Sequence, residues 1–487
     1  MDAIARLRED LSRAGYTADK VVEAITDQGQ LALTRNHTVA ATRALAGRDD
    51  PLATLIRLFI LQQPQPAPAV AHALDVDSLM RLGILQAHTD GFRAALDIRP
   101  YAHEIDQVYG WVVSDHVAEL DTRDCPPSPD LVLGVNPASM SLAQITPARQ
   151  VEGALDLGTG CGIQSLHLAK HASQVVATDL NPRALTLATL TFALNGIEAS
   201  TKLGSLYEPV AMQSFDMIVT NPPFVIAPQV GQRLTYRETE YPSDEFMKAV
   251  IQGAEPRLDP GGSLHIVGNW AHITGQDWRQ RVQEWIPQGC DAIMIQREVL
   301  DPYEYIEIWL ADAGLRGRQE YIQRYDQWLT YFDELKIEAV GMGWLTMVKS
   351  GSETPRVITE HWPYAVNDDV ADDLMAHLTA MKYADLPDEE ILKTGWVLAD
   401  GTIQESTGTP GEPDPSHIVL RRTDGLGRAH EVSTASGGIL GACDGDLPLG
   451  TIINAVADLL DQDHQALTSN ILAEIRTLIC QTWLTAT

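Results

Sequence analysis

The sequence has few cysteines, and none of them lies close to another. Its five cysteines are spread over 487 residues without a C-x-x-C pair, and its fourteen histidines are scattered, with no H-x-x-x-H pair on a convincing helix. Short spacings of this kind are the usual sequence signature of a metal site. We therefore expect no metal, and cysteines that are free thiols in a reducing compartment.

Long apolar runs are missing as well. No stretch of about 20 apolar residues occurs, and a helix that crosses a bilayer needs about that many. The run from Met1 to Asp10 is charged throughout and lacks the apolar region of a signal peptide. We expect no membrane segment and a cytoplasmic location.

Positive charge is scarce. The chain has 35 Lys and Arg against 66 Asp and Glu, a formal net charge of -31 at pH 7. A protein that neutralises phosphates usually carries a basic stripe, because released counterions supply much of the affinity. The sequence has no basic cluster beyond Arg316-Gly317-Arg318 and Arg421-Arg422. The charge therefore argues against a nucleic-acid partner, although a local patch can still bind RNA on an acidic protein.

A glycine-rich turn stands between an expected strand and an expected helix. Val151 to Leu155 is apolar like a buried strand, the run Asp156-Leu157-Gly158-Thr159-Gly160-Cys161-Gly162 follows it, and Ile163 to His171 has a helical pattern. Glycines let such a turn tighten and let backbone N–H groups approach a ligand. This order is typical of a nucleotide site at the carboxyl edge of a parallel sheet.

An acidic residue ends the next expected strand, Gln174 to Thr178. Asp179 follows the glycines by about 20 residues, the interval at which a carboxylate can accept both hydroxyls of a ribose. The glycines are spaced G-x-G-x-G, whereas dinucleotide sites have G-x-G-x-x-G. This difference disfavours a nicotinamide or flavin cofactor.

The second motif is Asn221-Pro222-Pro223-Phe224, after an apolar strand expected over Phe215 to Thr220. An amide or exocyclic amine is a poor nucleophile because its lone pair is delocalised. Hydrogen bonds from its N–H groups to the Asn221 side-chain oxygen and the Pro222 carbonyl would favour the more cationic nitrogen of a transition state. The prolines fix that carbonyl in place, and Phe224 can stack on a flat group. Taken alone, the motif could also be a proline-rich strand end that only turns the chain.

Together the two motifs resemble those of the class I S-adenosylmethionine-dependent methyltransferases, over Leu131 to about Lys349. The resemblance implies a Rossmann-like α/β fold with a seven-stranded sheet and S-adenosylmethionine as the cofactor. Asp179 would hold the ribose, Pro223 would contact the substrate, and Asn221, Pro222 and Phe224 would be catalytic. The residues that would line the methionine moiety are Asp156, Gly158, Gly160 and Gly162.

The tetrapeptide is similar to that of two groups within this family. One methylates the glutamine amide of peptide-chain release factors, and the other methylates exocyclic amines of adenine or guanine in RNA or DNA; Phe224 is compatible with both. We expect an N-methyltransferase with a macromolecular substrate, protein or RNA, and favour a protein glutamine slightly on charge alone. The alternative of another class is a noncatalytic scaffold that keeps the cofactor pocket. The oligomeric state is not indicated.

Additional contacts are expected around the motifs. Many relatives carry an Asp after the third strand for the adenine amino group; Ser205 and Leu206 stand there in this chain and are candidates for that contact. Thr146 is a candidate for the cofactor carboxylate, its alternative being a plain helix cap. Tyr236 and Arg237 lie in a polar stretch where a lid or substrate-contacting loop would sit, although a merely solvated loop fits equally well.

The flanks predict two more domains, in line with the length of the chain. Residues 1–100 look mostly helical and end in a hairpin around Asp90-Gly91, an order that resembles a winged helix; we expect it to cap the substrate or to dimerise. Residues 101–350 would form the methyltransferase domain. Residues 351–487 would form an α+β domain, with a hairpin over Ile418 to Val432.

Overall fold

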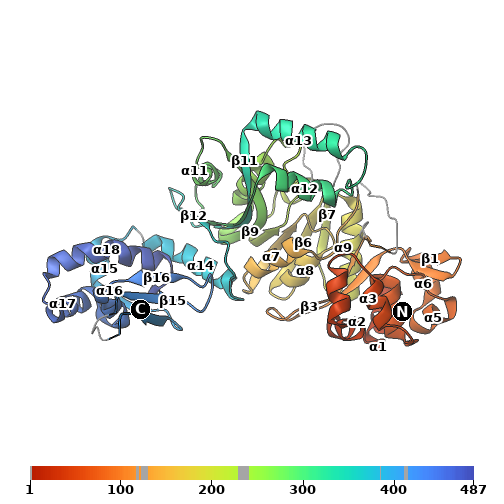
Figure 1. The fold of residues 1–487 in the computed structure, drawn as a ribbon, viewed down its shortest axis with the longest axis horizontal. Helices are drawn as coiled ribbons and strands as arrows, with labels where there is room; N and C mark the ends of the chain where they lie inside the picture. Colours follow the sequence, from red (N-terminus) through yellow and green to blue (C-terminus); the bar gives the residue numbers. More distant parts are fainter. Residues whose placement is uncertain (1–2, 117–119, 122–129, 229–240, 384, 411–414) are drawn as a thin grey trace.

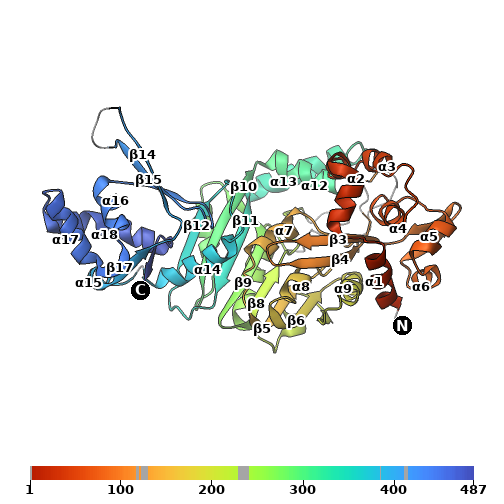
Figure 2. The same ribbon diagram turned by 90° about the horizontal axis from the view of Figure 1, so that it is seen from below.

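The computed structural model describes residues 3–116, 120–121, 130–228, 241–383, 385–410 and 415–487. The chain runs from a group of helices at one end, through a central sheet, to a second group of helices and short strands at the other end (Figures 1 and 2). Within these ranges, every helix is too short or too polar to cross a membrane.

The central sheet has eight strands in the order β12-β10-β11-β9-β8-β5-β6-β7. Strand β11 runs antiparallel to both β9 and β10, and the other neighbours are parallel. The predicted Rossmann-like α/β fold is confirmed, with one strand more than the seven expected because β12 adds beside β10. The strands are β5 (Val151–Leu157), β6 (Ala172–Asp179), β7 (Ser200–Leu203), β8 (Phe215–Thr220), β9 (Leu258–Ile273), β10 (Asp291–Leu300), β11 (Ile337–Val348) and β12 (Val357–His361).

Apolar side chains on both faces of the strands hold helices against the sheet. Ala154 and Met217 pack in a cluster with α7 and α14, whereas their neighbours Leu155 and Ile218 pack in a cluster with α10 and α11. Successive side chains of a strand point to opposite faces, so the continuous apolar runs of β5 and β8 are buried on both sides. The helices concerned are α7 (Pro137–Ile145), α10 (Glu245–Ala254), α11 (Trp278–Gln283) and α14 (Val370–Ala380).

The strand order reverses beside β5. The chain passes from β5 through α8 (Ile163–Leu168) to β6, through α9 (Pro182–Asn195) to β7, and then returns to form β8 on the other side of β5. In open α/β sheets the carboxyl ends of the strands form a crevice at such a reversal. The glycine turn follows β5 and the Asn-Pro-Pro-Phe motif follows β8, so both lie at this crevice.

The N-terminal helices share a hydrophobic core with α8 and α9, which cover the central sheet. The expected hairpin around Asp90-Gly91 is confirmed, since β1 pairs with β2, and β3 and β4 form a second hairpin. Asn195 of α9 accepts a hydrogen bond from the N–H of Trp111 in β4 (2.9 Å) and donates one to its carbonyl (2.7 Å). The N-terminal elements are α1 (Ala3–Arg13), α2 (Ala18–Leu33), α3 (Val39–Ala44), α4 (Pro51–Leu55), η1 (Ile56–Ile60), α5 (Ala67–Ala73), α6 (Val76–Arg81), β1 (Leu85–His88), β2 (Gly91–Ala94), β3 (Asp97–His103) and β4 (Val108–Ser114).

The C-terminal elements form two small sheets, β14-β15-β16 and β17-β13-β18, with helices around them. The expected hairpin over Ile418 to Val432 is confirmed by the pairing of β15 with β16. The division into three domains stays a prediction; its border at 100 falls inside β3, and β12 lies beyond its border at 350. The elements are η4 (Met381–Tyr383), α15 (Asp388–Lys393), β13 (Gly395–Leu398), β14 (Ile403–Thr407), β15 (His417–Arg421), β16 (Ala429–Val432), α16 (Thr434–Gly441), β17 (Asp444–Pro448), α17 (Leu449–Leu459), α18 (His464–Cys480) and β18 (Leu484–Ala486).

Candidate cofactor and acceptor site

The three positions of the turn require glycine for different structural reasons. Gly158, Gly160 and Gly162 all have positive φ, at +74°, +55° and +86°, a conformation that L side chains rarely adopt. A Cβ added at Gly158 or Gly160 would meet no described heavy atom within 4 Å, whereas one at Gly162 would lie 2.6 Å from the ring of Phe192 in α9. The first two glycines keep the turn open, and the third lets α8 pack against α9.

The Asp156 side chain holds the glycine turn in place through hydrogen bonds. One of its carboxylate oxygens accepts hydrogen bonds from the Thr159 hydroxyl (2.6 Å), the Ser165 hydroxyl (2.7 Å) and the Ser165 N–H (3.0 Å). The side chain is buried, and this burial raises its pKa to about 6. Three donors on one oxygen join β5 to the middle of the turn and to the first turn of α8, so Asp156 shapes the backbone that faces the cavity.

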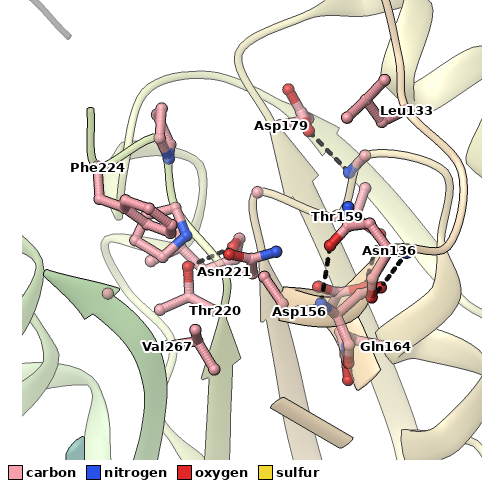
Figure 3. A pocket seen from close by; sticks show the side chains of 18 of the residues that line it. Leu133, Asn136, Asp156, Thr159, Gln164, Asp179, Thr220, Asn221, Phe224 and Val267 are labelled. Atoms are coloured by element: carbon pink, nitrogen blue, oxygen red, sulfur yellow. Dashed lines mark hydrogen bonds between the residues drawn. The ribbon is translucent and has the colours of Figure 1, made fainter. Parts of the chain in front are cut away.

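Asp179 stands at the end of β6 and reaches back to the same turn. Its carboxylate accepts hydrogen bonds from the N–H of Gly160 (3.0 Å) and of Asn181 (2.8 Å), and burial raises its pKa. A carboxylate has about four lone-pair sites, so acceptor capacity is left for hydroxyl groups of a ligand. Figure 3 shows the Asp179 side chain with its hydrogen bond to the backbone of the glycine turn.

The Asn-Pro-Pro-Phe segment is fixed at both of its ends. The Thr220 hydroxyl at the end of β8 donates to the Leu157 carbonyl of β5 (2.7 Å). Beyond the motif, the Ile226 N–H donates to the Tyr305 hydroxyl (2.9 Å), and the Ile226 carbonyl accepts from the Trp328 ring N–H (2.7 Å). These two aromatic residues belong to α12 (Pro302–Asp312) and α13 (Tyr321–Leu335). The segment is therefore held independently of any ligand.

Phe224 is positioned by an aromatic neighbour. Its ring meets that of Trp309 in α12 edge to face, with centroids 6.1 Å apart and an interplanar angle of 74°. Such a pair fixes the orientation of both rings. Phe224 is only half buried and lines the pocket, so part of the ring is accessible to a ligand.

Both motifs open onto one cavity of about 1050 Å³. This volume exceeds that of most sites for a single small ligand, so a nucleoside cofactor and a second group fit together. Figure 3 shows Asp156 and Asp179 on one side of this space and Asn221 and Phe224 on the other. The predicted residues that line it are Asp156, Gly158, Gly160, Asp179, Ser205, Leu206, Asn221, Pro222, Pro223 and Phe224.

Some predicted site residues lie elsewhere. Gly162 does not line the cavity. Thr146 lines a separate small cavity, and its hydroxyl donates to the Leu142 carbonyl one helical turn back (2.7 Å), as expected for a residue at the end of α7. Tyr236 and Arg237 fall outside the described residues.

Sequence reasoning missed two parts of the cavity wall. One comes from α7 and the residues before it, where Asn136 caps the helix and Ser141 accepts a hydrogen bond from the ring N–H of Trp344 (2.6 Å). The other comes from β10 and β11, where the Arg297 guanidinium lies 4.6 Å from the Trp344 ring centroid. The Asn136-Pro137 helix start is a recognisable capping signal, but no short-range pattern marks Arg297 or Trp344.

Two family models match the chain. Residues 133–276 match the methyltransferase small domain, and residues 13–95 match a domain of unknown function. The first match contains the glycine turn, Asp179 and the Asn-Pro-Pro-Phe motif. It covers the part of the sheet from β5 to β9 and leaves out the strands that bear Arg297 and Trp344.

Relatives of known name match the same region. A ribosomal RNA small subunit methyltransferase C of Alcanivorax borkumensis is 32% identical over 115 residues, which are 24% of this chain and 31% of the relative. A release factor glutamine methyltransferase of Geobacter sulfurreducens is 32% identical over 130 residues, 24% of this chain and 46% of the relative. The matches thus span less than half the length of either relative.

Solved structures also match. One is a T. thermophilus 16S rRNA methyltransferase in complex with AdoMet and guanosine; it is 18% identical, covers 45% of this chain and 57% of that chain, and has a TM-score of 0.28. For residues 133–276, the family match and the named relatives confirm the class I S-adenosylmethionine-dependent methyltransferase domain predicted from the two motifs, and with it S-adenosylmethionine as the cofactor.

Proposed function

We propose that this protein transfers a methyl group from S-adenosylmethionine to a planar amide or exocyclic amino nitrogen of a macromolecule. The observation that carries the proposal is the single cavity that the glycine turn, Asp179 and the Asn-Pro-Pro-Phe motif share. A methyl donor and its acceptor must meet within a few ångströms in line with the bond that breaks. Two motifs on separate cavities could not serve that reaction.

The residues present fit the cofactor. The backbone of Gly158 and Gly160 has open space where a side chain would project, which suits close contact with the methionine end. The half-buried Asp179 carboxylate has acceptor sites left for ribose hydroxyls. Ser205 and Leu206 line the same space and would contact the adenine. S-adenosylmethionine supplies a methyl group on a positively charged sulfur, ready for displacement by a nitrogen.

The methyl acceptor would lie on the side of the cavity formed by the Asn-Pro-Pro-Phe motif. The Asn221 side-chain oxygen and the Pro222 carbonyl accept the two N–H groups of the acceptor, and Phe224 packs on its flat face beside Pro223. When bound, S-adenosylmethionine would supply the methyl group and keep the electron pair of the broken carbon–sulfur bond on sulfur, and the methylated nitrogen would lose one proton to solvent. The Asn221 and Pro222 oxygens stabilise the nitrogen of the methyl acceptor most while it is cationic, so they act mainly on the transition state.

A protein glutamine is favoured over a nucleobase on charge. The chain carries a formal net charge of -31, and an RNA or DNA acceptor would need a local basic surface to offset it. The named relatives include one of each type. A cytoplasmic location belongs to the same proposal, because both kinds of acceptor are found there.

The acceptor class is tested with labelled cofactor. Purified protein is incubated with labelled S-adenosylmethionine and, in turn, with ribosomal RNA and with a total protein extract. We expect label in protein. Peptide mapping without acid hydrolysis, which would cleave side-chain amides, should locate the label at the amide of a glutamine. Label in RNA alone would reverse the ranking of acceptors. Label in neither fraction would favour a noncatalytic cofactor-binding scaffold.

The role of the tetrapeptide is tested with Asn221→Ala. Turnover should fall by roughly 100-fold to 1000-fold, the usual cost of removing one preorganised group that stabilises a transition state. Affinity for S-adenosylhomocysteine, measured by calorimetry, should stay close to wild type, because Asn221 lies on the acceptor side of the cavity. A variant with normal turnover would refute the role given to Asn221.

A further inference from the structure

We propose that His103, Asp106 and His167 form a binding site for a divalent cation of the zinc type, outside the methyltransferase cavity. Each of the three side chains offers one ligand atom, and these atoms lie within 4.8 Å of one another. Two imidazoles and a carboxylate are a common protein ligand set for zinc, which takes a water or another group in its fourth position.

The three residues come from two separate parts of the fold. His103 ends β3, Asp106 lies in the connection to β4, and His167 belongs to α8. The two carboxylate oxygens of Asp106 face the Nδ1 atoms of the two histidines, one each. The side chains are 10%, 11% and 4% exposed, respectively, so bulk water does not compete strongly for the ligand atoms.

In the structure, the Nδ1 of His167 is hydrogen-bonded to Asp106, and a bound cation would take the place of the proton between them. The Tyr101 hydroxyl lies 2.8 Å from the Nε2 of His167 and 3.3 Å from the Sδ of Met140. When Nε2 carries the hydrogen, the hydroxyl oxygen accepts it and Nδ1 serves as the metal ligand. Metal-bound histidines usually have such a partner on the other ring nitrogen.

A small cavity beside the cluster has room for the fourth ligand. It is lined by Asp106, His167 and His171, among others, and its volume of about 10 Å³ is close to the space that one water needs. The Nε2 of His171 is buried and has no hydrogen-bond partner among the described residues. A cation-bound water in this cavity would give that nitrogen a partner.

The site would join the β3–β4 hairpin to the helix that follows the glycine turn. Because α8 starts at Ile163, directly after the turn, a cation there would stabilise the base of the cofactor pocket. The sequence led us to expect no metal, because it has no C-x-x-C pair and no H-x-x-x-H pair on a convincing helix. His167 and His171 do have the H-x-x-x-H spacing, but α8 ends at Leu168 and His171 lies beyond it.

The proposal is tested on the full chain after removal of metal with a chelator. Titration with Zn²⁺ should show a single tight equivalent and a rise in the thermal midpoint, and Co²⁺ should give the visible absorption of a tetrahedral site. His103→Gln should weaken Zn²⁺ binding by more than about 100-fold, beyond the roughly 10-fold to 100-fold effect of losing an outer hydrogen-bond partner. Tyr101→Phe should show that smaller, outer effect.

The matched control is His37→Gln. His37 also lies beside an aspartate, with its Nδ1 3.7 Å from Asp121, but its side chain is 66% exposed, so its loss should leave Zn²⁺ affinity unchanged. Equal affinity of His103→Gln and wild type would overturn the proposal. If His103→Gln does not fold, the wild-type titration decides, and absence of a tight equivalent and of a thermal shift would overturn the proposal as well. None of these readouts depends on methyl transfer.

Discussion

Alanine at Gly160 and at Gly162 should damage the protein in different ways, although the two residues are only two positions apart. Both glycines have positive φ, and an L residue in that conformation costs roughly 1–2 kcal/mol. At Gly160 the new Cβ would meet no described atom within 4 Å. The expected loss of stability for Gly160→Ala is therefore the backbone cost alone.

Gly162→Ala carries a second cost. Its Cβ would lie 2.6 Å from a ring carbon of Phe192 and 3.3 Å from the Cα of Ala188. The Phe192 ring is buried, so it cannot swing away freely, and overpacking of this kind typically costs 1–3 kcal/mol more. We expect a total loss of about 2–5 kcal/mol for Gly162→Ala.

Cofactor binding should show the opposite order. Gly160 lines the cavity and Gly162 does not, so the methyl group of Gly160→Ala would occupy space that the cofactor needs. We expect its affinity for S-adenosylhomocysteine to fall at least tenfold, about 1.4 kcal/mol, and that of folded Gly162→Ala to fall less. Gly438→Ala is the control, because its Cβ meets no described atom within 4 Å and its φ is not positive.

The assays are chemical denaturation for stability and calorimetry for affinity, on all three variants and wild type. Equal stability of the two turn variants would refute the packing role of Gly162. Wild-type affinity for S-adenosylhomocysteine in Gly160→Ala would refute the proposal that the glycine turn binds the cofactor. It would also refute the orientation of the cofactor on which the proposed transfer depends.

Two further variants test the walls of the cavity. Burial raises the pKa of Asp179, so its carboxylate should begin to protonate at a higher pH than an ordinary aspartate, and S-adenosylhomocysteine affinity should fall as the pH is lowered from 7.5 to about 5. Asp179→Asn should bind S-adenosylhomocysteine more weakly at pH 7.5 and lose this pH dependence. A wild-type affinity that does not change with pH would contradict the assignment of Asp179 to the ribose. Tyr305→Phe removes the acceptor of the Ile226 N–H and of the Asn269 side-chain amide, and leaving buried donors unpaired costs about 1–3 kcal/mol each. Turnover and stability should fall while cofactor affinity stays. Tyr325→Phe removes only solvent-exposed hydrogen bonds and should change neither turnover nor stability.

Residues that follow a strand directly could be placed from the sequence. The apolar runs of β5 and β8 are long enough to identify both strands, and parallel strands bring their carboxyl ends to one edge of the sheet. For that reason Gly160, Asp179 and Asn221 were expected together, and the structure has all three on one cavity. The eighth strand was not expected because β12 is a short edge strand with little apolar pattern.

Residues whose role depends on a distant neighbour could not be placed in this way. Gly162 belongs to the same motif as Gly160, yet a side chain is excluded there by the ring of Phe192, which belongs to another helix. Thr146 was expected to reach the cofactor, but the direction in which α7 ends turns it toward another cavity. Ser141 and Trp344 lie 203 positions apart in the sequence and still form one hydrogen bond in the cavity wall.

The sequence by itself determined the class of the methyltransferase domain, its cofactor and the two halves of the candidate site, because each half is a local pattern of strand, turn and special residues. Only the tertiary structure decided that the two halves share one cavity, which side chains close its far wall, and that His103, Asp106 and His167 meet. Those outcomes depend on how β10, β11 and the β3–β4 hairpin pack against the sheet. Packing joins residues across long stretches of chain, and a local pattern holds no record of it.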